Sequence, residues 1–213
     1  MKEPSARILI ADDERNIRKN LAMVLESAGY QVDEARDGEE ALALCRDTHP
    51  DIAFVDLHMP KMEGLDVLAH FRTLSPKTAV VIITAYGSAA NAVEAMKLGA
   101  VDFIEKPFDP KIIGIIAEEI LFRERHGAGG SFDDLMHLAD LARERNAHLE
   151  ARAYLKAAMA RAADRPEPYY WLGYLAEAEG DAKRALQYYY MAFSASKTYE
   201  PVAAALKRLG KIH

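Results

Sequence analysis

The sequence predicts an α/β domain with a parallel sheet, followed by a smaller all-helical domain. In the first part of the chain, short β-rich apolar runs alternate with stretches of helical period, which is typical of a parallel sheet covered by helices on both faces. Beyond residue 131 no β-rich run occurs, and alanine recurs at helical spacing. Half of the 213 residues are hydrophobic and 28% are charged, so the chain can bury a sizeable core.

Five apolar runs are expected to be strands, and each is followed by a helical stretch. Residues 8–10 and 80–83 are apolar without alternation, as in strands buried on both faces. Gly29 stands where a glycine commonly ends a helix, and Asp37 with Glu40 resembles a capping box at a helix start. The five expected strands cover residues 7–11, 30–35, 51–55, 79–84 and 100–105.

A change of composition predicts where the two domains meet. Residues 126–131 contain three glycines, which favours a flexible linker between a first domain over 1–125 and a second over 132–213. Residues 1–125 carry 15 basic and 22 acidic side chains, whereas residues 126–213 carry 12 and 11. The acidic excess therefore belongs to the first domain.

Charge, hydropathy and cysteine content exclude several classes of protein. The net charge of −6 argues against a protein held to nucleic acid by bulk charge. No apolar run approaches the roughly 20 residues needed to cross a bilayer, and the first residues lack the apolar stretch of a secretory signal. The single cysteine, Cys45, lies in an apolar stretch and is expected to be a buried small side chain. We therefore expect a cytoplasmic protein without a membrane partner.

Polar side chains follow the ends of four expected strands. Asp12 and Asp13 end the first, Asp56 the third, Thr84 the fourth and Lys106 the fifth. Ligands of such sheets gather beyond the carboxyl ends of the strands, so these side chains should meet at one edge. Crowded carboxylates raise one another's pKa unless a cation compensates them. An all-oxygen donor set favours Mg²⁺ as that cation.

This arrangement indicates phosphoryl chemistry. A carboxylate beside Mg²⁺ can attack a phosphoryl group to give an acyl phosphate, and Asp56 is the candidate nucleophile. Asp12 and Asp13 would hold the metal, Lys106 would face the phosphoryl charge, and Thr84 could donate a hydrogen bond. Each residue taken singly also has a structural interpretation, since an Asp after a strand often caps a helix. The prediction depends on the whole set.

Four motifs stand at the ends of the expected strands: Ile8-Leu9-Ile10-Ala11-Asp12-Asp13-Glu14, Val55-Asp56-Leu57-His58-Met59-Pro60 with Gly64, Ile83-Thr84-Ala85, and Asp102-Phe103-Ile104-Glu105-Lys106-Pro107-Phe108. Through these motifs, residues 5–125 resemble the response-regulator receiver domains of two-component signalling, which have a flavodoxin-like doubly wound fold. Residues 84–87 and 95–100 are similar to receivers that precede the ATPase of NtrC-type activators, although that ATPase is missing here.

The resemblance implies roles for residues of the acidic edge. Asp56 would accept phosphate from a sensor histidine kinase, and the Lys106-Pro107 bond would be cis. Thr84 and Phe103 would form a switch in which phosphorylation draws Thr84 inward and lets Phe103 turn from exposed to buried. Mg²⁺ would be surrounded by the carboxylates of Asp12, Asp13 and Asp56 and the main-chain carbonyl of His58. The His58 side chain is expected to affect the lifetime of the acyl phosphate without ligating the metal.

The second domain contains an internal repeat. A shift of 34 residues places like on like: Leu135 on Tyr169, Leu138 on Leu172, Ala139 on Gly173, Ala142 on Ala176, Ala151 on Ala185, Leu155 on Tyr189, and Ala158 on Ala192. The pattern resembles the tetratricopeptide repeat, with copies at 132–165 and 166–199 and a closing helix at 200–210. Asn146 and Gly180 would lie at the turns. A generic array of helical hairpins is the alternative.

The helical domain is expected to bind proteins or peptides. Two repeats leave an apolar end exposed, so this domain should pack on the receiver or on a second copy, forming a homodimer. Tyr169 and Tyr189 are expected in the core of the domain. The near-zero net charge of the helical domain argues against DNA binding. Aromatic residues are favoured in interface cores, and the candidates for a partner contact are Tyr170, Trp171, Tyr174, Tyr188 and Tyr190.

The sequence thus predicts a phosphorylation-dependent response regulator whose output is protein binding. We do not expect an enzyme beyond self-phosphorylation from small donors and self-dephosphorylation. A constitutive scaffold and a phosphorelay intermediate remain alternatives. A phosphatase of the haloacid-dehalogenase type would require an aspartate two residues after the nucleophile, where this chain has His58.

Overall fold

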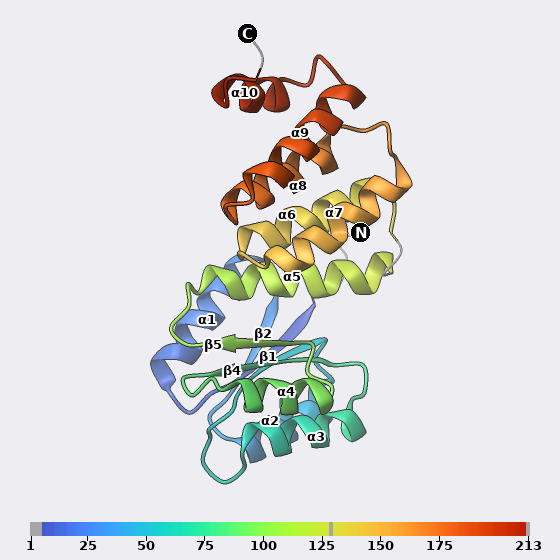
Figure 1. Ribbon diagram of the computed structural model, residues 1–213. Coiled ribbons are helices and arrows are strands. Elements are labelled where there is room, and N and C mark those ends of the chain that lie inside the picture. Colours follow the sequence, from blue (N-terminus) through green and yellow to red (C-terminus); the bar gives the residue numbers. More distant parts are fainter. Residues whose placement is uncertain (1–5, 128–129, 212–213) are drawn as a thin grey trace. The chain divides into compact units, whose positions relative to one another are not determined.

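The computed structural model describes residues 6–127 and 130–211 (Figure 1). The predicted domains and linker also include residues 1–5, 128–129 and 212–213, which lie outside the described residues. The chain forms two compact units, Met1–Ile120 and Leu121–His213. Their division falls within helix α5 (Lys111–His126), just before the glycine-rich stretch. The boundary at 126–131 therefore stays a prediction.

The first unit contains a five-stranded parallel sheet, as predicted. Its strands lie in the order β2-β1-β3-β4-β5. Strands β1 and β4 are almost completely buried, which explains their lack of alternation. The strands are β1 (Arg7–Ala11), β2 (Gln31–Ala35), β3 (Ile52–Asp56), β4 (Ala79–Thr84) and β5 (Asp102–Glu105).

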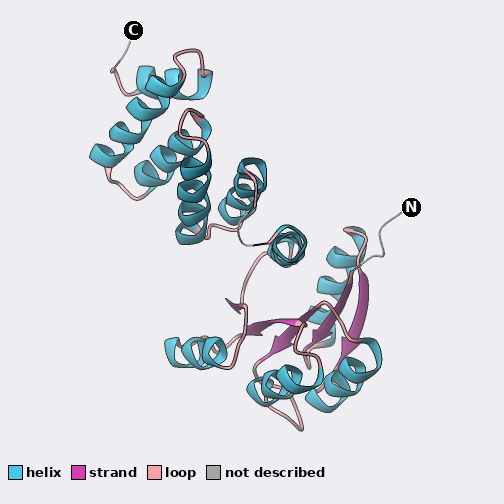
Figure 2. Ribbon diagram, turned by 90° about the vertical axis from the view of Figure 1, so that its right-hand side faces the viewer, coloured by secondary structure: helices cyan, strands magenta, loops and turns pink. Residues whose placement is uncertain are grey.

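Helices cover both faces of this sheet (Figure 2). Helices α2, α3 and α4 lie on one face, and α1 and α5 lie on the other (Figure 1). The core under α2 and α3 includes Leu9, Phe71 and Cys45, which is buried as expected. The remaining helices of this unit are α1 (Arg15–Ser27), α2 (Gly38–Thr48), α3 (Gly64–Leu74) and α4 (Ala89–Lys97).

The helix ends agree with the sequence except at one predicted capping box. Gly29 follows α1 with a φ of 94°, a conformation that favours glycine. The Asp37 side chain caps α2 by accepting from the Glu40 N–H at 2.9 Å. The capping box also predicts that the Glu40 carboxylate accepts from the Asp37 N–H. This prediction is wrong, because the carboxylate accepts from the Arg36 N–H instead.

The second unit is helical, and consecutive helices pack against one another. The bounds of α7 and α9 differ by 34 residues at both ends, which is the shift found in the sequence. Asn146 and Gly180 occupy equivalent turns with φ values of 60° and 81°. The helices are α6 (Phe132–Glu144), α7 (His148–Arg161), α8 (Glu167–Ala178), α9 (Ala182–Ala195) and α10 (Glu200–Arg208).

The core of this unit is built from the repeated positions. Tyr169 and Tyr189 are buried, as predicted, and so are the small residues Ala142 and Ala176. The second repeat places Gly173 against the ring of Tyr189. None of the described helices combines the length and the apolar composition that a membrane span requires.

Candidate metal centre

Three carboxylates meet at the carboxyl edge of the sheet. Asp56 is the last residue of β3, while Asp12 and Asp13 follow β1, its neighbour in the sheet. One carboxylate oxygen from each residue lies within 4.8 Å of the others. Asp12 and Asp56 are buried, and Asp13 is exposed. The rule that ligands gather beyond strand ends therefore located this cluster.

Lys106 joins the cluster from the end of β5. Its Nζ donates to Asp12 Oδ2 at 2.6 Å and to Asp56 Oδ2 at 2.8 Å. Its main-chain N–H donates to the Thr84 carbonyl at 2.7 Å, and its peptide bond to Pro107 is cis. A single ammonium thus bridges two buried carboxylates, and it leaves the cluster with an excess of negative charge.

Burial and charge shift the pKa values of two of these groups. Burial raises the pKa of the Asp12 carboxyl above its ordinary 3.8, against the lowering effect of hydrogen bonds from Lys106 and the Glu14 N–H. Burial alone would lower the pKa of Lys106, but its hydrogen bonds to Asp12 and Asp56 raise it above 10.5. Lys106 is therefore charged at neutral pH. A further cation beside Asp12 would stabilise the charged form of its carboxylate.

The loop after β3 is shaped around the Asp56 main chain. Gly64 donates its N–H to the Leu57 carbonyl at 2.7 Å. A Cβ added to Gly64 would lie 2.2 Å from the main-chain oxygen of Asp56, so a side chain there would displace the strand end. Asp56 Oδ1 also accepts from the His58 N–H at 3.3 Å. These contacts hold the carboxylate beside Asp12.

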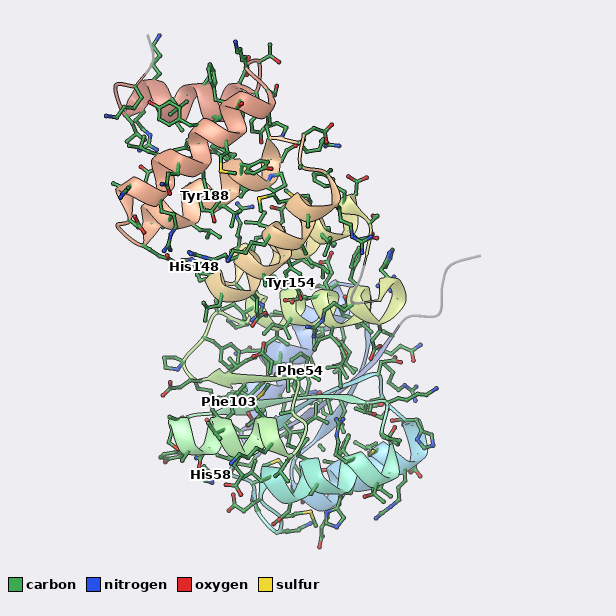
Figure 3. The ribbon with its side chains drawn as sticks, turned by 45° about the vertical axis from the view of Figure 1, so that its right-hand side comes forward. Phe54, His58, Phe103, His148, Tyr154 and Tyr188 are labelled. Atoms are coloured by element: carbon green, nitrogen blue, oxygen red, sulfur yellow. The ribbon has the colours of Figure 1, made fainter. Side chains whose placement is uncertain are left out.

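The donor set fits a hard divalent cation. All three clustered side chains offer carboxylate oxygens, the ligands that Mg²⁺ prefers. The carbonyl of His58, the fourth predicted ligand, stays a prediction. The His58 side chain is exposed (Figure 3). Its Nδ1 lies 3.0 Å from Glu63 Oε2, and its ring makes a T-shaped contact with the Tyr86 ring, with 5.1 Å between the centroids. The structure therefore assigns the ring a carboxylate partner and an aromatic neighbour.

Thr84 adjoins the cluster through its main chain, because its carbonyl accepts from the Lys106 N–H, but in the described part of the chain its hydroxyl makes no hydrogen bond to the three carboxylates. Thr84 is buried, and its Oγ1 accepts from the Tyr86 N–H at 3.0 Å. Phe103 is half-buried on β5 and packs against the core (Figure 3). The structure thus shows one arrangement of this pair, and the predicted switch between two arrangements stays a prediction.

Arg18 is a residue of this region that the sequence analysis missed. Its Nη1 donates to the main-chain oxygen of Asp12 at 2.7 Å and of Asp13 at 3.1 Å. Arg18 lies one turn after Glu14, whose carbonyl accepts its main-chain N–H. Only this spacing in α1 could have indicated that the side chain reaches back to the acidic loop.

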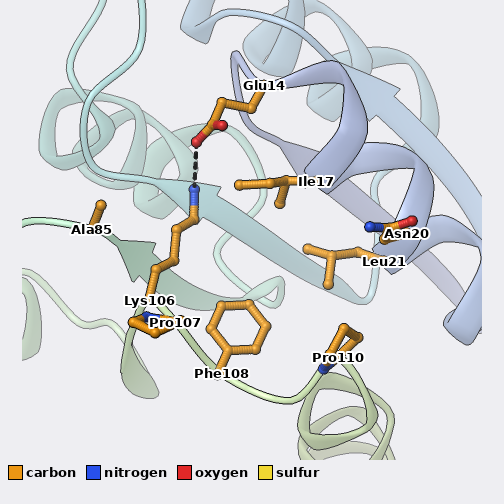
Figure 4. A pocket seen from close by; sticks show the side chains of 9 residues that line it. All are labelled: Glu14, Ile17, Asn20, Leu21, Ala85, Lys106, Pro107, Phe108 and Pro110. Atoms are coloured by element: carbon orange, nitrogen blue, oxygen red, sulfur yellow. Dashed lines mark ion pairs between the residues drawn. The ribbon is translucent and has the colours of Figure 1, made fainter.

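A pocket of about 410 Å³ is lined in part by Lys106 and Glu14 (Figure 4). Lys106 Nζ lies 4.0 Å from Glu14 Oε1 at its edge. Ile17, Leu21 and Phe108 make much of the lining apolar. The ammonium that faces the carboxylates is therefore next to an accessible surface.

The aromatic candidates of the helical unit do not form one uniform surface. Tyr174 and Tyr190 are 49% and 46% exposed, whereas Tyr170, Trp171 and Tyr188 are half-buried. The guanidinium of Arg143 lies 3.2 Å from the centroid of the Trp171 ring. A role of these residues in partner binding stays a prediction.

Comparison with known proteins identifies the first unit. Residues 8–116 match the family described as response regulator receiver domain. The chain is 39% identical to the chemotaxis protein CheY of Thermotoga maritima over 105 residues, which are 49% of this chain and 88% of that protein. It is also 39% identical to the regulatory protein AtoC of Escherichia coli over 115 residues, but these span only 25% of that protein.

A solved structure shows the same fold. The receiver domain protein from Methanospirillum hungatei is similar with a TM-score of 0.55 and 32% identity. The match covers 58% of this chain and all of that one. The likeness thus concerns the receiver part of the chain.

Proposed function

The chain belongs to the response regulator receiver family through residues 8–116, and we propose that it is a phosphorylation-dependent response regulator with a protein-binding output. Asp56 would accept a phosphoryl group from a sensor histidine kinase. The observation that carries this proposal is the placement of Asp56 beside Asp12 and Asp13, with Lys106 bonded to Asp12 and Asp56. Receiver domains are phosphoacceptor modules, and no further catalytic activity is proposed.

The residues of the cluster have complementary roles in phosphoryl transfer. A carboxylate oxygen of Asp56 forms the new bond to phosphorus, while the bond from phosphorus to the donor breaks and its electron pair leaves with the donor. Lys106 is placed to offset charge on the phosphoryl oxygens. Asp12 and Asp13, with Asp56 and the His58 carbonyl, would hold Mg²⁺, which supplies further charge neutralisation when bound.

Phosphorylation would be transmitted through Thr84 and Phe103. The Thr84 hydroxyl would leave the Tyr86 N–H and donate to a phosphoryl oxygen. Phe103, now half-buried, would then move further into the core. Such a pair links the chemistry to β5 and to the neighbouring helices by shifting a two-state equilibrium.

The helical unit would carry the output as a tetratricopeptide-like module. The equal spacing of α7 and α9 and the equivalent turns at Asn146 and Gly180 support a 34-residue repeat. A protein, a peptide or a second copy of the chain would contact its aromatic residues. Phosphoryl transfer from a kinase requires that both proteins share a compartment. We expect this compartment to be the cytoplasm, where Cys45 would stay reduced.

Phosphate incorporation tests this proposal against a constitutive scaffold. The purified chain, given Mg²⁺ and acetyl phosphate, should gain acid-labile phosphate. Asp56→Asn should gain none, because the attacking carboxylate is replaced by an amide. A wild-type chain that remains unlabelled would favour the scaffold.

A further inference from the structure

The Arg18 side chain contacts the acidic loop from the side of α1. Its guanidinium is largely covered, with 13% of the side chain exposed. One nitrogen, Nη1, donates to two successive main-chain oxygens, those of Asp12 and Asp13. The contact therefore acts on the backbone that presents the two carboxylates, and Arg18 itself bonds to none of their carboxylate oxygens.

The other hydrogen bonds of this loop hold Asp12 but not Asp13. The Asp12 N–H donates to the Ala35 carbonyl at 3.1 Å, and the Glu14 N–H donates to Asp12 Oδ1 at 2.8 Å. Asp13 is exposed, and in the described residues its hydrogen bond is the one from Arg18 to its main-chain oxygen. Arg18 is thus placed to fix the position of Asp13 relative to Asp12.

The positive charge of Arg18 would weaken the binding of a divalent cation, whereas its hydrogen bonds to the loop would strengthen it. A guanidinium near the carboxylates would repel a divalent cation. Glu34 offsets this charge, because its Oε2 lies 3.6 Å from Arg18 Nε. The same carboxylate also pairs with Lys19 Nζ at 2.6 Å. The two effects of Arg18 on metal affinity therefore differ in sign, and an experiment can separate them.

We propose that Arg18 is a positioning residue of the metal centre, which strengthens divalent-cation binding by holding the Asp12 and Asp13 main chain. This inference rests on the proposed function, since it assumes that the cluster binds Mg²⁺. Residues that orient metal ligands typically change metal affinity by about 10-fold to 100-fold when they are removed. We expect an effect in that range.

The test measures cation binding directly in the full chain. Free Mn²⁺, which accepts the same oxygen ligands, is followed by electron paramagnetic resonance, and Mg²⁺ is then added as a competitor. The variants are Arg18→Met, which removes the donor and the charge, and Arg18→Lys, which keeps the charge without the guanidinium. Lys19→Met is the matched control, because it removes the other cation paired with Glu34 and leaves the loop contacts intact.

The positioning role predicts a specific order of affinities. Arg18→Met should bind Mn²⁺ and Mg²⁺ about 10-fold more weakly than wild type, and Arg18→Lys should lie between them. Lys19→Met should stay within about twofold of wild type, since an exposed charge is screened by salt. Tighter binding by Arg18→Met would overturn the proposal, and so would wild-type affinity in both Arg18 variants.

Three outcomes separate the possible interpretations. If Arg18→Met does not fold, Arg18→Lys still separates the interpretations, because a role through charge alone predicts wild-type affinity and positioning predicts weaker binding. If wild type itself binds neither Mn²⁺ nor Mg²⁺, the proposed function fails together with this inference. If wild type binds and the Arg18 variants bind equally well, only the role of Arg18 is wrong.

Discussion

Lys106 is the residue on which the charge of the acidic edge depends most directly. Its ammonium lies between Asp12 and Asp56, and 10% of its side chain is exposed. Removing it would leave two buried carboxylates facing one another without their cation. It would also remove the cation that is placed to offset charge on an incoming phosphoryl group.

Replacing Lys106 by methionine should therefore slow phosphorylation of Asp56. Loss of one preorganised group of this kind typically costs about 100-fold to 1000-fold in rate, and we expect a decrease of that order. The rate of acid-labile phosphate incorporation from acetyl phosphate at saturating Mg²⁺ measures it. An unchanged rate in a folded Lys106→Met variant would contradict the role given to this residue.

Residue types at strand ends predicted the acidic cluster, but they could not predict Arg18. Aspartates after buried strands lie at one edge of any parallel sheet, so their convergence follows from the pattern. An arginine near the start of an amphipathic helix is usually a solvated surface residue. Its contact with two backbone oxygens depends on the side-chain path, which no periodicity encodes.

At the scale of elements, the helical unit depends on a close contact between α8 and α9. A Cβ on Gly173 would lie 2.7 Å from the Tyr189 ring, which is completely buried. The first repeat has Ala139 and Leu155 at the equivalent positions. The larger ring in the second repeat is thus matched by the smaller residue opposite it, as close packing requires.

Gly173→Ala should lower the free energy of unfolding by about 1 to 3 kcal/mol, because the new methyl group overpacks this contact. In the presence of Tyr189→Leu, Gly173→Ala should lower the free energy of unfolding by less, since the pair then matches Ala139 and Leu155 of the first repeat. Gly114→Ala in α5 is the control, because its Cβ would meet Val24 at an ordinary 3.7 Å. Urea unfolding measures all three, and equal effects of the two alanines would refute the packing argument.

An ion pair joins α8 to α10. Arg208 donates to both carboxylate oxygens of Glu177 at 2.6 and 2.9 Å, and the Tyr189 hydroxyl donates to the same carboxylate at 2.7 Å. The hydrogen bonds from Arg208 and then from Tyr189 lower the pKa of Glu177 below its ordinary 4.5. The folded state therefore favours the charged carboxylate.

The pH dependence of stability should reflect this pair. A lowered pKa contributes stability that is present above pH 4.5 and is lost as the pH falls through the folded-state value. Glu177→Gln should therefore melt at a lower temperature than wild type at pH 7, and the difference should shrink below pH 4.5. Thermal melting at several pH values measures it, and a difference that persists undiminished in acid would contradict this explanation.

The pattern of the sequence predicted the type of each element better than its ends. Alternating β-rich and helical stretches predicted the five strands, because parallel strands buried on both faces have a distinctive composition. The order of the strands in the sheet is set by long-range packing and could not be deduced from the pattern. The Glu40 side chain bonds to Arg36 because that N–H is also within reach, and spacing alone does not decide between the two.

In the whole molecule, an acidic unit with a cluster of three carboxylates is followed by a helical unit with the exposed tyrosines Tyr174 and Tyr190. The family match covers residues 8–116 and says nothing of the helical unit. If the helical unit carries the output, its partners must depend on the state of Asp56. A scaffold would show no such dependence.

A pull-down from the native host distinguishes these two possibilities. The full chain with beryllofluoride, which mimics the phosphorylated state, should capture a set of proteins different from that of the untreated chain. Asp56→Asn should capture the same proteins with and without beryllofluoride, because the acceptor is absent. Identical sets for wild type in both states would contradict a regulated output.

The proposed signalling requires the Asp56 carboxylate to form an acyl phosphate. Borohydride reduces an aspartyl phosphate to homoserine, so the modified position can be read by peptide mass spectrometry after treatment with Mg²⁺ and acetyl phosphate. We predict homoserine at position 56, and none when Mg²⁺ is removed by a chelator. Homoserine at another aspartate, or at none, would contradict the claim.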